Sequence, residues 1–386
     1  PMSKRILIEI HDGKTALALM DENRLLSFSR EKQAGIEPEQ IYLCVVDRIV
    51  RGMEAAFVKL DKKQIGFLPF SECREKPKSG DRLLLQVKKP PIGEKGAYLT
   101  ADLSLAGHTV ILTPASLRAA VSKKITDAET RRRLYALADR LSPSGMGLVM
   151  RLESADAAEA DIAAEVQSLL AKWQGIAQKA AQAQAPCMIA GRESLLMRLL
   201  RDEPGGVSEI LCNVPEALPG VSVPVRLCEN PFAIYAVQGR LDKSLKRKVW
   251  LDCGGFLVID RTEALTVIDV NSGKFTGGKA GTEATFLKLN QEAAREIARL
   301  LRLRGIGGII LIDFVDMQAP ESREAVTQAL EEALRSDPVK AVIHGFTSLG
   351  LMELTRKKTE ETNPVPTPLC PYCHGTGLKE EELPCP

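Results

Sequence analysis

Residues 265–278 read LTVIDVNSGKFTGG and residues 307–317 read GGIILIDFVDM. In both stretches a short run of aliphatic and β-branched residues, typical of a strand buried on both faces, ends on an acid, Asp269 or Asp313. A helical pattern joins the two runs, so the sequence predicts neighbouring strands of an α/β sheet with both acids at one edge. Burying a carboxylate is costly unless a cation meets it, and carboxylate oxygens suit hard ions. The pair therefore predicts a site for Mg²⁺ or Mn²⁺.

Other polar groups in these stretches add to the predicted site. Asn271 lies two residues beyond Asp269, so in an extended strand it points to the same face and orients the acid or a bound water. A divalent ion held there generates hydroxide and stabilises charge on a scissile phosphate. The alternative is that both acids are structural groups that cap strand ends. Asp316 follows in the second stretch at a register that leaves its role open.

The helix predicted between the acidic strands, over residues 282–304, has two distinct faces. One is an apolar stripe that ends before Gly305, a residue typical of helix ends. It consists of Phe286, Leu289, Ala293, Ile297 and Leu300. The other face carries Lys288, Arg295, Arg299 and Arg302. These cations either follow a phosphate backbone or pair with Glu292 and Glu296, and for the helix alone the ion-pair interpretation is favoured.

Residues 36–109 contain five short β patterns separated by basic and glycine-containing turns, which is typical of a small closed barrel of the OB type. Such barrels bind single strands through aromatic faces on a positive background. Phe57 and Phe67 are the best stacking candidates, with Tyr42 behind them. The alternative for each phenylalanine is a place in the core. The candidate cations are Lys59, Lys62, Lys63, Lys88, Lys89 and Lys95.

Composition limits the classes of function. A chain of 386 residues allows about two to four domains, and a net charge of +2 with 26% charged residues does not by itself indicate nucleic acid. The sequence has no run of eighteen apolar residues and therefore predicts no membrane span. The start, PMSKRILIEIHDG, lacks the layout of a signal peptide, so we expect a cytoplasmic protein. Alanine-rich helical patterns fill much of residues 116–185.

Nine cysteines, seven of them without paired spacing, favour reduced thiols over a disulfide framework. Cys370 and Cys373 form the motif CPYC behind a proline-rich linker. A redox motif of this kind needs a following helix, whereas HGTG follows here, so zinc is favoured. Tetrahedral Zn²⁺ needs four ligands, and this motif supplies only a pair. The remaining ligands are His374 with Cys385 or the same motif of a second chain, and a zinc shared across a symmetric dimer is preferred.

Six motifs spread over nearly the whole chain resemble the catalytic region of the ribonuclease E/G family. They are EAAFVKLDKKQIGFLPF, PSGMGLVMR, EALTVIDVNSGKFTGG, LRLRGIGGIILIDFVDM, LGLMELTRKK and CPYCHGTG. The resemblance implies an endoribonuclease of RNA processing and decay. It implies hydrolysis of single-stranded RNA to 5′-phosphate and 3′-hydroxyl ends, with a preference for 5′-monophosphate substrates. Because the sequence stops soon after the cysteine pair, the compact ribonuclease G type is expected.

The resemblance also implies roles for residues that match the family's motifs. Asp269 and Asp313 would hold the catalytic Mg²⁺ with the support of Asn271. Cys370 and Cys373 would form an interchain zinc link. The residues implied to contact RNA are Phe57, Phe67, Lys95, Arg151 and Lys340. One departure concerns the 5′ sensor, where the family has threonine after the arginine and this chain has Leu152. The hydroxyl that would bind the 5′ phosphate is missing. We therefore expect a weakened dependence on 5′-monophosphate.

The implied fold class is an α/β multidomain protein. Its predicted parts are an RNase-H-like domain (1–35 and 181–247), an OB-type RNA-binding barrel (36–107), a helical 5′-sensor region (108–180), a deoxyribonuclease-I-like catalytic domain (248–362) and the zinc link with its tail (363–386). A function of a different class is also open. The barrel alone is consistent with a non-catalytic protein that binds single-stranded RNA.

Overall fold

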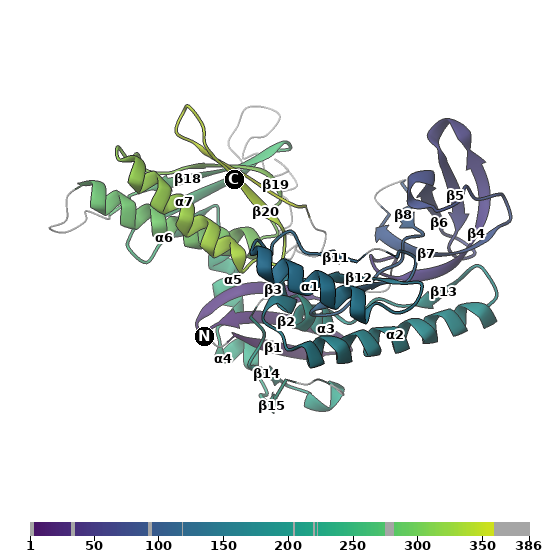
Figure 1. Cartoon of the computed structure of the whole chain (residues 1–386). Coiled ribbons are helices and arrows are strands. Elements are labelled where there is room, and N and C mark those ends of the chain that lie inside the picture. Colours follow the sequence, from purple (N-terminus) through teal and green to yellow (C-terminus); the bar gives the residue numbers. More distant parts are fainter. Residues whose placement is uncertain are drawn as a thin grey trace, which may run out of the picture. The chain divides into compact units, whose positions relative to one another are not determined.

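The computed structural model describes residues 4–31, 35–91, 95–117, 119–203, 205–218, 221, 223–274 and 282–358. Figure 1 gives the element labels. The chain divides into two compact units, of which one combines Pro1–Glu31 with Gly206–Pro386 and the other is Lys32–Gly205. Among the described residues, no helix is both long enough and apolar enough to cross a membrane.

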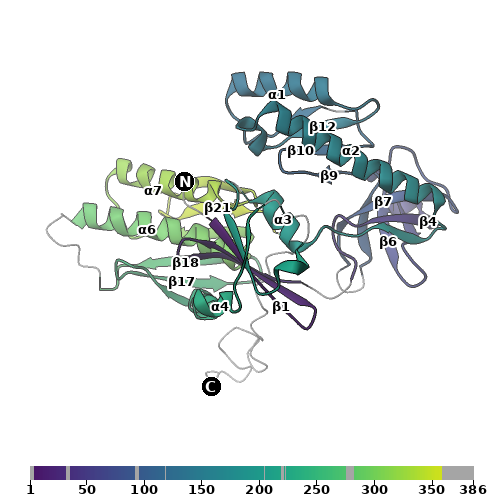
Figure 2. The ribbon, with the colours of Figure 1, turned by 90° about the horizontal axis from the view of Figure 1, so that it is seen from below.

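A six-stranded sheet carries the two acidic strands. Its order is β16-β17-β18-β19-β21-β20, and only β18 and β19 pair in parallel. The strands are β16 (Lys248–Trp250), β17 (Phe256–Arg261), β18 (Leu265–Asn271), β19 (Gly308–Asp313), β20 (Ala341–Phe346) and β21 (Met352–Arg356). Helices α6 (Thr282–Leu303) and α7 (Pro320–Arg335) lie side by side on one face of this sheet (Figure 2).

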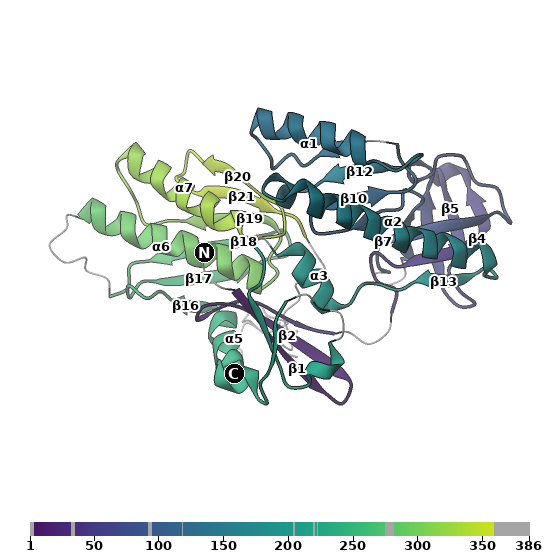
Figure 3. The ribbon, with the colours of Figure 1, turned by 60° about the horizontal axis from the view of Figure 1, so that its bottom comes forward.

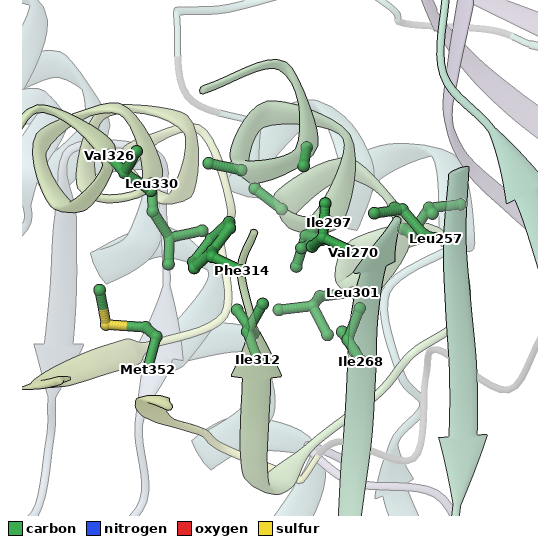
Figure 4. Close-up of a cluster of buried hydrophobic side chains, with 14 of the residues drawn as sticks. Leu257, Ile268, Val270, Ile297, Leu301, Ile312, Phe314, Val326, Leu330 and Met352 are labelled. Carbon is green, nitrogen blue, oxygen red and sulfur yellow. The ribbon is translucent and has the colours of Figure 1, made fainter. Parts of the chain in front are cut away.

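The core of this unit lies between the sheet and these helices. Ile268 and Ile312 point from the acidic strands toward Ile297 and Leu301 of α6 (Figure 4), and all four are fully buried. These helical residues recur at the spacing of one helix face, which is why α6 forms across the strands. The helix predicted between the two acids is therefore confirmed, and its apolar stripe is the buried side.

The prediction that both acidic strands are buried on both faces is wrong. Val267 and Ile309, which alternate with the buried residues, are 36% and 52% exposed. Because both helices cover the same face, the aliphatic residues on the other face stay open to solvent. Asp269 and Asp313 are exposed and belong to this open face.

A five-stranded sheet completes the same unit. Its order is β15-β14-β1-β2-β3, with β1 parallel to β14 and antiparallel to β2. The elements are β1 (Lys4–His11), β2 (Lys14–Asp21), β3 (Arg24–Arg30), β14 (Glu209–Cys212), η4 (Pro215–Ala217), β15 (Val225–Leu227), α4 (Pro231–Ile234) and α5 (Val237–Leu245). Helix α6 connects the two sheets, because its Leu303 packs with Leu7 and Leu25 of this sheet.

Five strands of the other unit close into a barrel. They are β4 (Ile41–Val50), β5 (Ala55–Lys59), β6 (Ile65–Pro69), β7 (Arg82–Lys89) and β8 (Ala97–Thr100), with the turns η1 (Arg51–Met53) and η2 (Phe70–Glu72). The order β4-β5-β6-β8-β7 returns to β4 through the β4–β7 pairing, and β6 and β8 form a parallel pair. The five predicted strands are confirmed, and the closed barrel is compatible with the OB type. Tyr42 lies in the barrel core, only 6% exposed.

The rest of this unit combines a small sheet with helices. The elements are β9 (Leu105–Ala106), β10 (Val110–Thr113), β11 (Ala120–Val121), α1 (Ala128–Leu141), β12 (Gly147–Met150), η3 (Leu152–Ala155), α2 (Glu159–Gln182), β13 (Cys187–Ala190) and α3 (Leu195–Asp202). The sheet has the order β11-β12-β10-β9, and α2 runs beside β10 (Figure 3). Strand β13 pairs with β4 of the barrel. The alanine-rich patterns of the sequence correspond to α1 and α2.

A buried ion pair fixes the start of the second acidic strand. The guanidinium of Arg356 donates to both oxygens of Asp337, at 2.7 and 3.1 Å, and the two side chains are 0% and 3% exposed. The same guanidinium donates to the carbonyl of Ile306 at 2.8 Å. Two residues later β19 begins, so Arg356 ties α7, β21 and the entry of β19 together.

Candidate active site

Strand register places the two predicted acids side by side. Strands β18 and β19 pair in parallel, and the register that begins with Leu265 opposite Ile309 ends with Asp269 opposite Asp313. Directly opposite residues of neighbouring strands point to the same face, so the two carboxylates share one edge and one face of the sheet. The prediction that these acids are neighbours is confirmed.

Asn271 holds one of these carboxylates. Its amide nitrogen donates to Oδ2 of Asp269 at 2.7 Å, as the two-residue spacing predicts. The turn after Asn271 requires a glycine, because Gly273 has a φ of +56° and a Cβ there would stand 2.7 Å from the carbonyl oxygen of Gly254. The turn therefore packs closely against the backbone of Gly254, and Asn271 stays at the end of β18.

The segment after Asp313 is fixed by Asn290 of α6, a residue that the sequence analysis did not single out. Asn290 is fully buried, its amide nitrogen donates to the carbonyl of Val315 at 2.7 Å, and its amide oxygen accepts from the N–H of Val315 at 3.1 Å. The available signal was an amide beside Leu289 on the apolar side of the helix, since a buried amide needs partners. Asn290 sets the course of the backbone between Asp313 and Asp316.

Negative charge gathers around Asp313. Partial desolvation raises the pKa of its carboxyl above the usual range, and the charges of Asp269 and Asp316 raise it further. Asp316, whose role the sequence left open, thus lies near enough to raise the pKa of Asp313. A cation held by the two neighbouring carboxylates would reverse this effect, because an opposite charge favours the ionised form.

The donor set fits a hard ion that is only partly surrounded by protein. Mg²⁺ is usually bound through one or two carboxylates, keeps several waters and takes further oxygens from substrate phosphates. Within the described ranges no group of three or more His, Cys, Asp and Glu side chains is arranged to hold a metal. Two adjacent carboxylates, Asp269 and Asp313, match the number that Mg²⁺ usually takes from a protein.

A row of three aromatic rings crosses the barrel. Phe57 of β5 lies opposite Phe67 of β6, which lies opposite Tyr98 of β8, and the successive ring centroids are 5.8 and 6.1 Å apart. The guanidinium of Arg48 stands 4.7 Å from the Phe57 ring, and the ammonium of Lys89 stands 5.6 Å from the Tyr98 ring. Half-buried rings flanked by cations form the kind of surface on which bases of a single strand stack.

Comparison with known proteins then decides the family. A family model described as "Ribonuclease E/G family" matches residues 104–359. Ribonuclease G of Salmonella typhimurium is 32% identical, with 100% of this chain and 86% of that protein covered. Ribonuclease G of Haemophilus influenzae is 33% identical (98% and 85% covered), and ribonuclease E of Synechocystis sp. is 33% identical (97% and 60% covered). The chain belongs to the ribonuclease E/G family.

As a member of the ribonuclease E/G family, this chain is an endoribonuclease, and RNA is its substrate. The family model matches residues 104–359, which include both acidic strands and lie outside the five barrel strands. The interpretation as a non-catalytic protein that uses the barrel alone is therefore not favoured.

Other residues implied by the ribonuclease E/G resemblance lie in varied surroundings. Lys95 is exposed two residues before β8, and Lys340 is exposed just before β20 in the unit that carries the acids. Cys370 and Cys373 lie outside the described residues. Tyr98 is a barrel residue that sequence reasoning missed, although its alternation with the buried Ala97 and Leu99 would have placed it on the outer face of β8.

Arg151 is already engaged by protein groups. Its guanidinium donates to Oδ1 of Asp202 at 2.9 Å and to the carbonyl of Gly107, and a carboxylate oxygen of Glu153 lies 3.8 Å away. The side chain is only 19% exposed. Leu152 begins η3, and its side chain packs against the core of this unit. Residue 152 thus contributes packing rather than a hydroxyl.

The basic face of α6 divides into buried and exposed parts. Arg299 pairs with Glu296 at 2.5 Å, which confirms the ion-pair interpretation for this residue. Arg302 is only 5% exposed and donates to the carbonyl of Ser336 at 3.0 Å, so it cannot follow a phosphate backbone. Lys288 and Arg295 remain exposed.

The raised pKa of Asp313, caused first by desolvation and then by the charges of Asp269 and Asp316, predicts a stability effect. The folded state holds the proton of Asp313 more tightly than the unfolded chain, because its pKa is raised. This residue therefore stabilises the fold most at low pH, and the contribution is lost as pH rises through the folded-state pKa. At pH 7 without divalent ions, Asp313→Asn is expected to raise Tm by about 1 °C, the scale of one relieved like-charge contact.

Thermal unfolding between pH 4 and pH 8 measures this effect. The matched control is Asp260→Asn, because Asp260 accepts hydrogen bonds from Arg247 that lower its pKa, so its loss should leave Tm unchanged or reduce it. A lower Tm for Asp313→Asn at pH 7 would contradict the proposed repulsion.

Proposed function

We propose that this chain is a metal-dependent endoribonuclease that hydrolyses single-stranded RNA at Asp269 and Asp313, leaving 5′-phosphate and 3′-hydroxyl ends. The observation that carries the proposal is the register of β18 and β19, which sets the two carboxylates directly opposite each other on the open face. Asn271 supports the arrangement through its hydrogen bond to Asp269. The two neighbouring acids fit a single-ion proposal better than a two-metal site, which usually needs more carboxylates.

The proposed ion is Mg²⁺ or Mn²⁺, held by Asp269 and Asp313. When bound, such an ion supplies Lewis-acid stabilisation of charge on the scissile phosphate and lowers the pKa of water. The protein's own part is to fix the donors. Asn271 keeps the Asp269 carboxylate turned to the open face, and Asn290 keeps the chain after Asp313 in place.

RNA binding is proposed for the barrel, with Phe57 and Phe67 as the stacking rings and Lys95 as a phosphate contact. The paired rings and the flanking cations support this role. We further propose the architecture implied by the family: an RNase-H-like domain, an OB-type barrel with a helical 5′ sensor, and a deoxyribonuclease-I-like catalytic domain. The sequence also supports a dimer that shares zinc through Cys370 and Cys373.

A weakened dependence on 5′-monophosphate is proposed for the sensor. Arg151 would supply positive charge to it, but this guanidinium is compensated by Asp202. Lys340 is proposed separately as an RNA contact of the unit that carries the acids. Leu152 has no hydroxyl to donate to a phosphate, and its side chain is part of the packing. A terminal phosphate therefore gains less binding free energy at this site than at a site with an uncompensated arginine and a threonine.

Substitution of the acids tests the proposed chemistry. Asp269→Asn and Asp313→Asn are each expected to slow cleavage by at least about 10³-fold, because several kcal/mol of transition-state charge stabilisation are lost. Asn271→Ala is expected to slow cleavage by about 10- to 100-fold, as for other residues that orient a ligand. RNA affinity should stay nearly unchanged in all three variants. Single-turnover cleavage and fluorescence anisotropy of a labelled oligonucleotide give the two readouts.

The control for these variants is Asp260→Asn, which removes an exposed carboxylate from the neighbouring strand β17 and should keep cleavage within about twofold of the parent. Cleavage that survives in both Asp269→Asn and Asp313→Asn would remove the proposed site. Loss of RNA affinity together with cleavage would instead indicate that these residues act in binding.

The sensor is tested by restoring the hydroxyl. Leu152→Thr is expected to raise the ratio of cleavage rates on 5′-monophosphate and 5′-hydroxyl substrates by about two- to tenfold, the worth of one added hydrogen bond. Leu152→Val is the matched control, because valine has the shape of threonine without the hydroxyl. An equal ratio in the two variants would contradict the proposal.

A further inference from the structure

The row of the sheet that contains the acids continues to its edge strand. Asp313 lies opposite Asp269, Asp269 opposite Val258, and Val258 opposite Lys248. Opposite residues share a face, so the Lys248 side chain leaves the sheet on the same open face as both carboxylates. Two strand spacings separate the backbones of Lys248 and Asp269, a distance of about 10 Å.

The adjacent row carries two aromatic rings. Asn271 lies opposite Phe256, and Phe256 lies opposite Trp250 of the edge strand β16. The two ring centroids are 5.2 Å apart, with the ring planes at 59°. The Lys248 ammonium stands 3.6 Å from the Phe256 centroid and 4.5 Å from the Trp250 centroid. Trp250, Phe256 and Lys248 thus form one cluster, here called the edge platform, beside the acids.

Trp250, the largest ring of the edge platform, is exposed to solvent. Trp250 is 56% exposed, which is unusual for so large an apolar side chain. The ammonium of Lys248 contacts ring faces and has no carboxylate partner among the described residues, so the N–H donors that point away from the rings can bind an anion. An exposed aromatic ring with an adjacent ammonium offers a nucleotide both of the contacts it needs, one for the base and one for the phosphate.

A basic cavity of about 700 Å³ adjoins the edge platform and is lined in part by Lys248 and Trp250. Seven cationic and three acidic side chains line it. The acids are already engaged: Glu296 pairs with Arg299, Asp252 lies 3.8 Å from Arg24, and Glu292 accepts from the N–H of Cys253. The cavity therefore has a surplus of positive charge.

The surplus comes from two separate segments. Lys243 and Lys246 lie at the end of α5, Arg295 lies on α6, and all three line the cavity. In the part of the chain that the structure describes, none of these three side chains has a hydrogen bond or ion pair. The exposed part of the basic helix face and the basic residues before β16 thus meet in one place, next to the edge platform.

We propose that the edge platform is a binding subsite for one nucleotide of the RNA beside the bond that is cut. The base stacks on Trp250, its phosphate contacts Lys248, and the strand continues around the edge strand β16 into the cavity toward Lys243, Lys246 and Arg295. This subsite rests on the proposed function, because it takes Asp269 and Asp313 as the place of cleavage. It lies outside the barrel and adds a second stacking surface, placed on the same sheet as the acids.

Tryptophan fluorescence tests the subsite without cleavage. The chain has two tryptophans, Trp173 and Trp250. In a Trp173→Phe variant that also carries Asp269→Asn and Asp313→Asn, Trp250 is the only tryptophan, and single-stranded RNA should quench its emission as the base stacks. An RNA titration followed by anisotropy of a labelled oligonucleotide confirms that the strand is bound. Bound RNA with unchanged Trp250 emission would overturn the proposal.

Steady-state cleavage gives a second test in the parent chain. Trp250→Ala is expected to raise KM by about tenfold with a smaller change in kcat, the scale of one lost stacking contact, and Trp250→Phe should restore most of the loss. Ile309→Ala is the matched control, because it removes another exposed apolar side chain from the open face, four residues before Asp313. An equal KM in Trp250→Ala, Ile309→Ala and the parent would overturn the subsite.

Binding of an abasic RNA strand distinguishes the contribution of charge from that of stacking. RNA that lacks the bases should bind the parent and Trp250→Ala equally well, whereas Lys248→Ala should weaken the binding of both RNAs.

Failure of the subsite and failure of the proposed function give different results. If Asp269→Asn and Asp313→Asn still cleave, the proposed function fails; if they do not cleave and Trp250 is not quenched, only the subsite fails.

Discussion

Two like charges held on adjacent strands are the constraint on which the active-site half of this molecule depends. The parallel register of β18 and β19 sets Asp269 against Asp313, and neither strand can slip by one residue without turning its carboxylate into the core. The repulsion is resisted by packing on the other face, where Ile268 and Ile312 meet α6. The two carboxylates thus interact unfavourably, and a cation bound between them would relieve this interaction.

The one-sided cover of the sheet makes this arrangement useful. Since both helices lie on the same face, the opposite face presents the acids, the supporting Asn271 and the edge platform to solvent in two adjacent rows. Buried polar groups hold the surrounding chain. Asn290 fixes the segment after Asp313, and Arg356 with Asp337 fixes the approach to β19. Rigid strands thereby carry the groups proposed for chemistry, as precise sites require.

The sequence predicted those features that depend on local periodicity. The adjacency of Asp269 and Asp313, the helix between them and the five barrel strands follow from alternation, apolar stripes and turn residues, and all are confirmed. Solvent exposure of the acidic strands was predicted wrongly, because a run of β-branched residues looks the same whether helices cover one face or two. Asn290 and Tyr98 were missed, since their roles depend on partners distant in sequence.

The edge platform shows the same limit. Lys248, Trp250 and Phe256 become a cluster only through the pairing of β16 with β17, and their relation to the acids needs the register of a further pair. The sequence analysis identified the basic residues on α6 but had no means to bring them together with the basic residues before β16. Long-range register is therefore the information that composition and local patterns lack.

Binding of Mn²⁺ tests the central claim most directly. Titration of the chain with Mn²⁺, followed by electron paramagnetic resonance of the free ion in the presence of uncleavable RNA, should find a bound ion whose affinity falls by at least about tenfold in Asp313→Asn and in Asp269→Asn. Asp260→Asn should bind as the parent does. Equal Mn²⁺ affinity in the parent and in the double variant of Asp269 and Asp313 would contradict the assignment of this pair as the metal site.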